Sequence, residues 1–191
     1  MIALGAGLVA VIIGGVVVFG GGGRKEEFAQ RQLTTARATA EMGDLPTAAQ
    51  QFQTLIETYR GTDAAAEATI GLNQVRLING QNELAVTGLR EFISSRPDRK
   101  FLPPAYGLLG AALENASKPV EAAEAYRNAA GAADVDYLRA SYLVEAGRAL
   151  LTAGRRDDAA QLYREIVAEY GDTPMTTEAK VRLAELTAGR M

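Results

Sequence analysis

The apolar residues of this chain recur three and four positions apart from about residue 30 to the C-terminus, which is helical spacing and not strand alternation. In the clearest stretch, Tyr106, Leu109 and Leu113 fall on one helical face, and Ala122 and Tyr126 fall on a second face after a turn. The pattern predicts pairs of helices joined by tight turns, and therefore an all-α fold.

Proline, glycine and capping residues set the expected boundaries of four helical hairpins and one last helix. The predicted helices are Gln30–Met42, Pro46–Tyr59, Ala64–Asn79, Glu83–Ser95, Pro104–Asn115, Val120–Ala130, Asp136–Ala153, Asp157–Tyr170 and Thr176–Ala188. We expect residues 24–175 to form the repeats and residues 176–191 to form a C-terminal capping helix over the open end of the stack.

A stride of 37 residues runs through these hairpins and keeps three kinds of position in step. It separates the turn residues Gly43, Gly80, Ser117 and Gly154, the small residues Ala48, Ala85, Ala122 and Ala159, and the bulky residues Phe52, Leu89, Tyr126 and Tyr163. Self-similarity at a fixed period of this length predicts a solenoid of stacked hairpins. Small residues let the helices approach closely, and bulky ones fill the remaining space.

The third hairpin carries a family resemblance in the order and spacing of Tyr106, Leu109, Gly110, Leu113, Ala122, Tyr126 and Ala129. This set resembles the signature of the tetratricopeptide repeat (TPR), and the fourth hairpin repeats it with Gly147, Gly154, Ala159 and Tyr163. The resemblance implies a TPR-like α-solenoid of about four helix hairpins that acts as a protein-interaction module. Ala36 and Asn73 stand where the signature has glycine, so we expect looser packing in the first two hairpins.

The links between hairpins point to one branch of that family. The usual repeat has about 34 residues, and the extra residues here lie in links such as residues 59–64 and 170–175. These links resemble those of bacterial envelope members. A membrane helix followed by such repeats is also similar to the ancillary subunit of the bacterial secretory translocon, which implies an inner-membrane anchor with its repeats in the periplasm.

The composition excludes several classes of function. The chain has 191 residues with 20 basic and 23 acidic side chains, and its net charge of −3 gives no electrostatic footprint for nucleic acid. It contains no cysteine and no histidine, which removes thiol, imidazole and disulfide chemistry. Phosphate-binding loops, nucleophile elbows and paired-carboxylate motifs are also missing. We predict no enzyme, with no catalytic, cofactor-binding or metal site, and no nucleic-acid partner.

The first residues form a candidate membrane anchor. Met1 to Phe19 carry no charged side chain, and about 19 residues at about 1.5 Å each nearly span the roughly 30 Å hydrocarbon core of a bilayer. A cleaved signal peptide is the alternative, but it would have a basic start and a small-residue cleavage site. We therefore expect a transmembrane anchor and glycine tether over residues 1–23, in contact with lipid through residues 1–19.

Small residues inside this segment predict a face for packing against another membrane helix. They are Ala3, Ala6, Gly7, Ala10 and Gly14. The alternative is that they only reflect the usual glycine and alanine content of membrane helices.

The orientation in the membrane receives two opposing arguments. Arg24 and Lys25 follow the apolar segment, which by the positive-inside rule would leave the repeats in the cytoplasm. The envelope resemblance implies the periplasm instead. We follow the resemblance and expect a single-pass protein of the bacterial inner membrane with a periplasmic repeat domain.

In TPR proteins the first helix of each hairpin lines a concave face, and the resemblance carries this role to matching positions here. An apolar stripe is expected from Leu33, Ile70 and Val144, with Gly107 at the fourth position. Polar residues nearby are Arg37, Glu41, Gln74, Glu114 and Arg148. Such a face would hold a helix or an extended segment of a partner. The alternative is that the apolar members merely contact neighbouring helices.

Two functions follow from these features. The first is a structural or assembly subunit that docks on the extramembrane face of a secretory, outer-membrane assembly, respiratory or photosynthetic complex. The alternative is a chaperone-like accessory that binds unfolded clients at the secretory translocon. A chaperone would need a mobile apolar groove, whereas a structural subunit would associate persistently and in fixed ratio.

Overall fold

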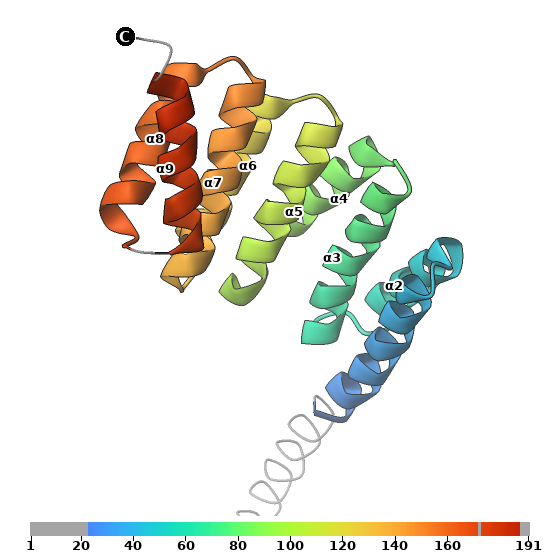
Figure 1. The fold of residues 1–191 in the computed structure, drawn as a ribbon. Helices are drawn as coiled ribbons and strands as arrows, with labels where there is room; N and C mark the ends of the chain where they lie inside the picture. The colour runs from blue at the N-terminus through green and yellow to red at the C-terminus, as the bar shows by residue number, and fades with distance from the viewer. Residues whose placement is uncertain (1–22, 172, 188–191) are drawn as a thin grey trace, which may run out of the picture. The chain divides into compact units, whose positions relative to one another are not determined.

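A computed structural model describes residues 23–171 and 173–187, and every regular element in those ranges is helical. Residues 23–41 are helical, followed by α2 (Leu45–Thr58), α3 (Asp63–Ile78), α4 (Asn82–Ser94), η1 (Arg99–Phe101), α5 (Leu102–Asn115), α6 (Pro119–Ala132), α7 (Asp136–Thr152), α8 (Arg156–Glu169) and α9 (Pro174–Thr187) (Figure 1). The all-α prediction is confirmed. The helices lie close to their predicted ranges, except that helical residues extend back to Gly23 and the short η1 was not expected.

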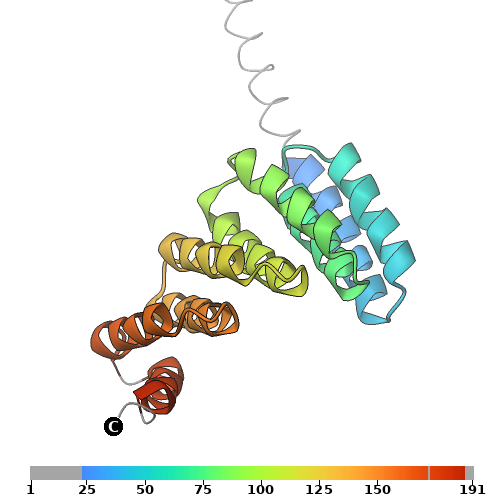
Figure 2. The same cartoon turned by 90° about the horizontal axis from the view of Figure 1, so that it is seen from above.

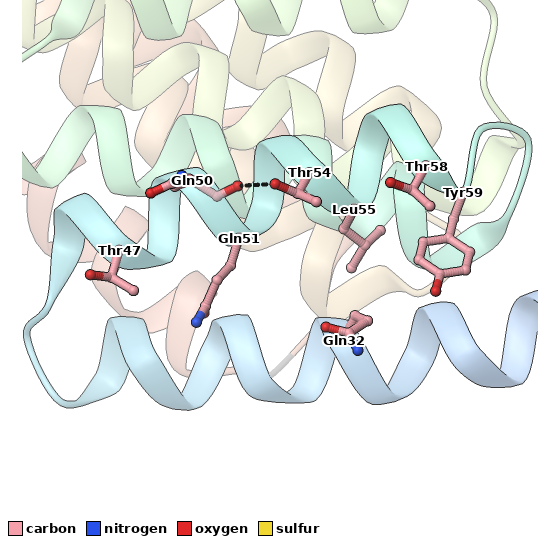
Figure 3. Close-up of a pocket in the computed structure, with 8 residues that line it drawn as sticks. All are labelled: Gln32, Thr47, Gln50, Gln51, Thr54, Leu55, Thr58 and Tyr59. Atoms are coloured by element: carbon pink, nitrogen blue, oxygen red, sulfur yellow. Dashed lines mark hydrogen bonds between the residues drawn. The ribbon is translucent and has the colours of Figure 1, made fainter.

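The chain divides into two compact units at Leu72 and Asn73, within α3. In the first unit, the helix of residues 23–41 and α2 lie side by side as a hairpin (Figure 3). In the second unit, each helix from α4 to α9 packs on the next, and α7 also packs on α9. Figure 2 shows these helices from above. The second unit is therefore a stack of antiparallel hairpins that ends in α9, as the repeat pattern predicts.

The turn residues that recur every 37 positions are the places where the backbone enters the left-handed region. Gly43, Gly80 and Gly154 have φ values of 85°, 74° and 74°, and Ser117 has 60°. Glycine adopts this region without strain, which explains its recurrence every 37 residues. Ser117 is the exception, because its Cβ makes the same turn unfavourable.

Glycine and tyrosine meet inside each of the last two hairpins. A Cβ on Gly110 would lie 2.6 Å from the Tyr126 ring, and a Cβ on Gly147 would lie 2.6 Å from the Tyr163 ring. Both tyrosine side chains are buried. The absent Cβ therefore makes room for the ring, as the spacing of these columns predicts.

The first two hairpins achieve the same density in other ways, so the expectation of looser packing is wrong. Asn73 replaces the signature glycine, is 1% exposed, and accepts a 3.1 Å hydrogen bond from Arg76 Nη1. It fits because it lies against Gly88, whose own Cβ would collide with the Asn73 amide. In the first hairpin Ala36 is fully buried, and the Phe52 ring lies against Gly71. At these positions the bulk has moved from one helix to the facing one, and the side chains remain closely packed.

The start of α3 is fastened to the preceding helix by charged side chains. Glu26 accepts hydrogen bonds from the backbone amides of Asp63 and Ala64, at 2.8 and 3.0 Å, and Lys25 donates a 2.7 Å bond to the Arg60 carbonyl. Amides at a helix start have no partner within the helix, so a carboxylate there is stabilising. Lys25 and Glu26 thus have a structural role within the first unit.

Among residues 23–171 and 173–187, no helix has both the length and the apolar character needed to cross a bilayer. The predicted anchor, Met1 to Phe19, lies outside the described residues, as do its predicted packing residues Ala3, Ala6, Gly7, Ala10 and Gly14.

Candidate protein-binding faces

The predicted apolar stripe is not an open groove. Leu33 is 1% exposed and Val144 is 3% exposed, so both belong to the core. Ile70 is half-buried, and Gly107 lies under the Tyr142 ring, which its missing Cβ accommodates. Leu33 and Val144 are therefore not accessible to a partner in this fold, which contradicts their predicted binding role.

The predicted polar positions, in contrast, reach the surface. Arg37, Glu41, Gln74 and Arg148 are exposed, and Glu114 is half-buried. In the first unit, Arg37 forms a 2.6 Å ion pair with Glu67 of α3. Glu67 lies 30 residues further along the chain. The pair joins the first helices of successive hairpins.

The same relationship recurs in the second unit, where it is part of a larger group of ion pairs. Arg148 of α7 pairs with Glu178 of α9, again 30 residues away, at 3.0 Å, and with Glu145 at 3.0 Å. Arg182 continues the row, 3.7 Å from Glu178 and 3.2 Å from Glu185. We call these five residues of α7 and α9 the charged face. Burial opposes the charge on Arg148, but the two neighbouring carboxylates outweigh burial and raise its pKa.

Glu145, Glu178 and Arg182 were not singled out from the sequence. The 37-residue stride compares a position with itself in the next hairpin, whereas these pairs join different positions 30 residues apart. A search for arginine and glutamate at that second spacing, with Arg37 and Glu67 as the guide, would have found Arg148 and Glu178.

Glu114 serves a different purpose from the other polar positions. Its carboxylate accepts a 2.7 Å hydrogen bond from the Tyr126 hydroxyl. Burial, the bond to Glu114 and the nearby negative charge all raise the pKa of Tyr126. Because Tyr126 belongs to the core, Glu114 anchors α5 to α6 and is only partly available to a partner.

A cleft of about 340 Å³ lies between the helix of residues 23–41 and α2 (Figure 3). Amide and hydroxyl side chains line it, from Gln32, Thr47, Gln50, Gln51, Thr54 and Thr58, with Leu55 and Tyr59 beside them. Uncharged polar linings of this kind hold no chemistry beyond hydrogen bonding.

The fourth hairpin shows what this cleft is. Three repeats after Gln32 and Gln51 stand Leu143 and Leu162, which are 7% and 2% exposed. Buried apolar residues thus occupy these positions in the fourth hairpin, and glutamines occupy them in the first. A polar outer face is what the terminal repeat of a solenoid requires. We interpret the cleft as the surface of that terminal repeat.

Within the described ranges, no three aspartate or glutamate side chains gather closely enough to hold a metal ion. The described acidic residues of the charged face are instead engaged by arginine. The chemistry that this surface offers is ion pairing between guanidinium groups and carboxylates.

Comparison with protein families agrees with the geometry. Residues 23–145 match the family model described as tetratricopeptide repeat-like domain, and residues 142–173 match that described as tetratricopeptide repeat. Among curated proteins, none matches the sequence.

Solved structures show the same fold at low sequence identity. The crystal structure of MamA protein is 17% identical with a TM-score of 0.65, and the match covers 86% of this chain and 83% of MamA. A putative kinesin light chain of Podosopora anserina with nearly identical TPR-like repeats is also 17% identical, with a TM-score of 0.66 and coverage of 83% and 85%. MamA from residue 41 to its end, from Desulfovibrio magneticus RS-1, is 21% identical, with a TM-score of 0.58 and coverage of 73% and 74%.

Proposed function

Because this chain belongs to the family of tetratricopeptide repeat-like domains, we propose that it is a non-catalytic, membrane-anchored scaffold for protein–protein interaction. TPR-like repeats bind protein partners, and stacked helical hairpins present extended surfaces for that purpose. In this proposal the protein is a structural or assembly subunit that docks on the periplasmic face of a larger bacterial membrane complex.

The charged face is the observation that carries the docking role. Its ion pairs are solvent-exposed, with Arg148 and Glu178 side chains 45% and 34% exposed, and such pairs add little to stability. The arginines and glutamates of the charged face can therefore exchange each other for charged groups on another protein. Such interprotein ion pairs fix the register of a complex and discriminate against wrong partners. An alternating row of carboxylates and guanidinium groups fits a partner surface with the opposite order of charges.

The membrane anchor rests on the apolar sequence from Met1 to Phe19, and the periplasmic location rests on the resemblance of the links to those of envelope proteins. Host complexes compatible with this proposal are secretory, outer-membrane assembly, respiratory and photosynthetic ones. The bilayer is the second partner, through residues 1–19.

The chaperone-like alternative receives less support. Binding of unfolded clients depends on an accommodating apolar groove, and two of the residues expected to line it, Leu33 and Val144, are buried. A charged face favours one complementary partner over a mixture of clients.

The test is native purification of the tagged full-length chain from its source membrane, with quantitative mass spectrometry. We expect a fixed-ratio set of companions. A charge exchange, Arg148→Glu with Glu178→Arg, keeps the net charge, reverses the order of this pair and places like charges beside Glu145 and Arg182. It should lower companion recovery about tenfold. Arg156→Glu is the matched control, because Arg156 is exposed at the start of α8 and outside the charged face.

Circular dichroism of each variant reports whether the fold is kept. A mixture of clients in place of a fixed set would refute the scaffold. Full recovery of companions by the folded charge-exchange variant would show that docking does not use the charged face.

A further inference from the structure

Two clefts flank the C-terminal half of α6, on surfaces separate from the charged face. One, of about 480 Å³, lies toward η1 and α5, with Leu102 and Tyr106 in its wall. The other, of about 370 Å³, lies toward α7 and α8, with Leu143 and Leu162 as its floor and Tyr170 beside them. Both clefts are lined by Arg127 and Gly131, so α6 forms a ridge between them.

Arginines dominate the rims of these clefts. Arg99 lines the first, Arg139 lines the second, and Arg127 stands between them, against one carboxylate, Glu165. Arg99 lies 3.6 Å from the exposed Asp134, and Arg139 is held by Asp136 and by the Ala133 carbonyl. Aspartates thus offset the charges of Arg99 and Arg139, and Arg127 is the arginine of the clefts whose pairing remains to be considered.

Arg127 has no ion-pair partner among the residues that the structure describes. One repeat earlier, Arg90 stands at the same position and pairs with Glu121 at 2.5 Å. The residue that follows Glu121 by one repeat is Asp158, which is shorter by one methylene and is taken by Arg155 at 2.6 Å. The guanidinium of Arg127 is thereby left available, and Arg readily forms two parallel hydrogen bonds to a carboxylate.

Gly131 lowers the ridge between the clefts. A Cβ at this position would meet nothing within 4 Å, so packing does not require glycine here, and glycine is a poor helix former. The matching residues of the other hairpins, Glu57, Ser94 and Ala168, all carry side chains. Absence of a side chain lets another backbone cross α6 closely, from one cleft to the other.

We propose that this surface docks an acidic segment of a partner protein, which lays its backbone across Gly131, places an apolar side chain in each cleft and pairs a carboxylate with Arg127. Charge complementarity selects the acid, and the tyrosine and leucine walls select the apolar side chains. Tyrosine and arginine are also the residues that most often dominate binding at protein interfaces. The inference rests on the proposed function only for the protein-binding role, and adds a second surface with a partner of different chemistry.

The test uses the full-length chain in detergent and a fluorescein-labelled peptide, Asp-Phe-Asp-Glu-Leu-Asp-Glu, followed by fluorescence polarisation. We expect saturable binding that weakens about tenfold when Asn and Gln replace the acidic residues of the peptide, and by a similar factor in Arg127→Glu. Gly131→Leu should also weaken binding, because its side chain fills the crossing point. The control Arg156→Glu makes the same change of charge outside both clefts and should bind as the parent does.

Binding of the peptide with equal affinity by Arg127→Glu and the parent would overturn the proposal, as would the lack of saturable binding by the parent. A labelled oligonucleotide that binds as tightly, and in the same Arg127-dependent manner, would show that the surface reads charge alone, and would also overturn it. A parent chain that keeps its fixed companions but ignores the peptide refutes this inference and leaves the proposed function standing.

Discussion

The Tyr126 hydroxyl donates a hydrogen bond of 2.7 Å to the Glu114 carboxylate and so joins the two helices of the third hairpin. One repeat later the same tyrosine recurs as Tyr163, but the residue matching Glu114 is Leu151. The buried Tyr163 hydroxyl has no hydrogen-bond partner among the described residues. Two tyrosines at equivalent positions therefore differ in one polar contact.

This difference predicts opposite responses to the same substitution. Tyr126→Phe removes a bond to a carboxylate and should lower the free energy of unfolding by about 1–2 kcal/mol. Tyr163→Phe removes an unsatisfied buried hydroxyl and should leave that free energy unchanged, or raise it by up to about 1 kcal/mol. Urea unfolding followed by circular dichroism measures both. Equal losses for the two variants would contradict the contrast.

Tyr163 also predicts a loss of stability in alkali. Burial, followed by nearby charges that partly offset one another, raises its pKa to about 12. The unfolded state releases this proton near pH 10. Between about pH 10 and 12 the unfolded state therefore binds fewer protons than the folded state, and the free energy of unfolding falls as pH rises.

The contribution of Tyr163 to this fall is roughly 2–3 kcal/mol. Tyr163→Phe should remove this contribution, so the variant should lose less stability than the parent between pH 10 and 12. Around neutral pH the free energies of unfolding of the two proteins should change with pH in the same way. Unfolding curves recorded at intervals from pH 7 to 12 make the comparison. Parallel pH profiles of parent and variant would show that Tyr163 ionises normally.

The two buried glycines predict a steric cost. Gly110→Ala and Gly147→Ala each place a methyl group 2.6 Å from a tyrosine ring that packing holds in place, and should each destabilise the fold by about 1–3 kcal/mol. Gly131→Ala is the matched control, since it is also helical but meets no atom within 4 Å. It should instead stabilise by about 0.5–1 kcal/mol. Thermal and urea unfolding measure the stabilities. A change of stability in the same direction for all three variants would contradict the prediction.

Ser117 predicts a stabilising substitution. Its φ of 60° lies where glycine stands in the other hairpins, so Ser117→Gly should relieve backbone strain and stabilise by about 1 kcal/mol. The reverse change at the equivalent turn, Gly80→Ala, should destabilise by a similar amount. A Ser117→Gly variant less stable than its parent would mean that the serine side chain contributes more than the strain costs.

The sequence predicts the turns and helices well and the partner-binding residues poorly, for a physical reason. Turn residues such as Gly80 reveal themselves because a left-handed backbone demands glycine, a local requirement visible in one residue type. Helix ranges can be predicted too, because the periodicity of apolar residues is also a local signal in the sequence. Leu33 and Val144 show the limit, because an apolar residue at helical spacing points to a neighbour without saying whether that neighbour is a partner or the protein's own next helix.

Compensation between positions is harder to foresee. Asn73 looked like a packing defect, since the repeat signature has glycine there, and only its contact with Gly88 shows that the space was supplied from the facing helix. The charged face could not be predicted for a similar reason, because Arg148 and Glu178 occupy different positions within the repeat. Contacts between different positions of the repeat are seen only in the three-dimensional structure, whereas the recurrence of one position is seen from the period alone.

Gln32 and Gln51 have a consequence for assembly. A solenoid with two apolar ends would add copies head to tail, because each end would complete the other, and a contact of that kind builds an open filament when its rotation does not close a ring. The exposed Gln32 amide makes such a contact costly, since its hydrogen bonds to water would be lost without replacement, and Gln51 adds a second polar side chain beside it. Two polar side chains of the first hairpin thus oppose polymerisation of the protein through its own repeats.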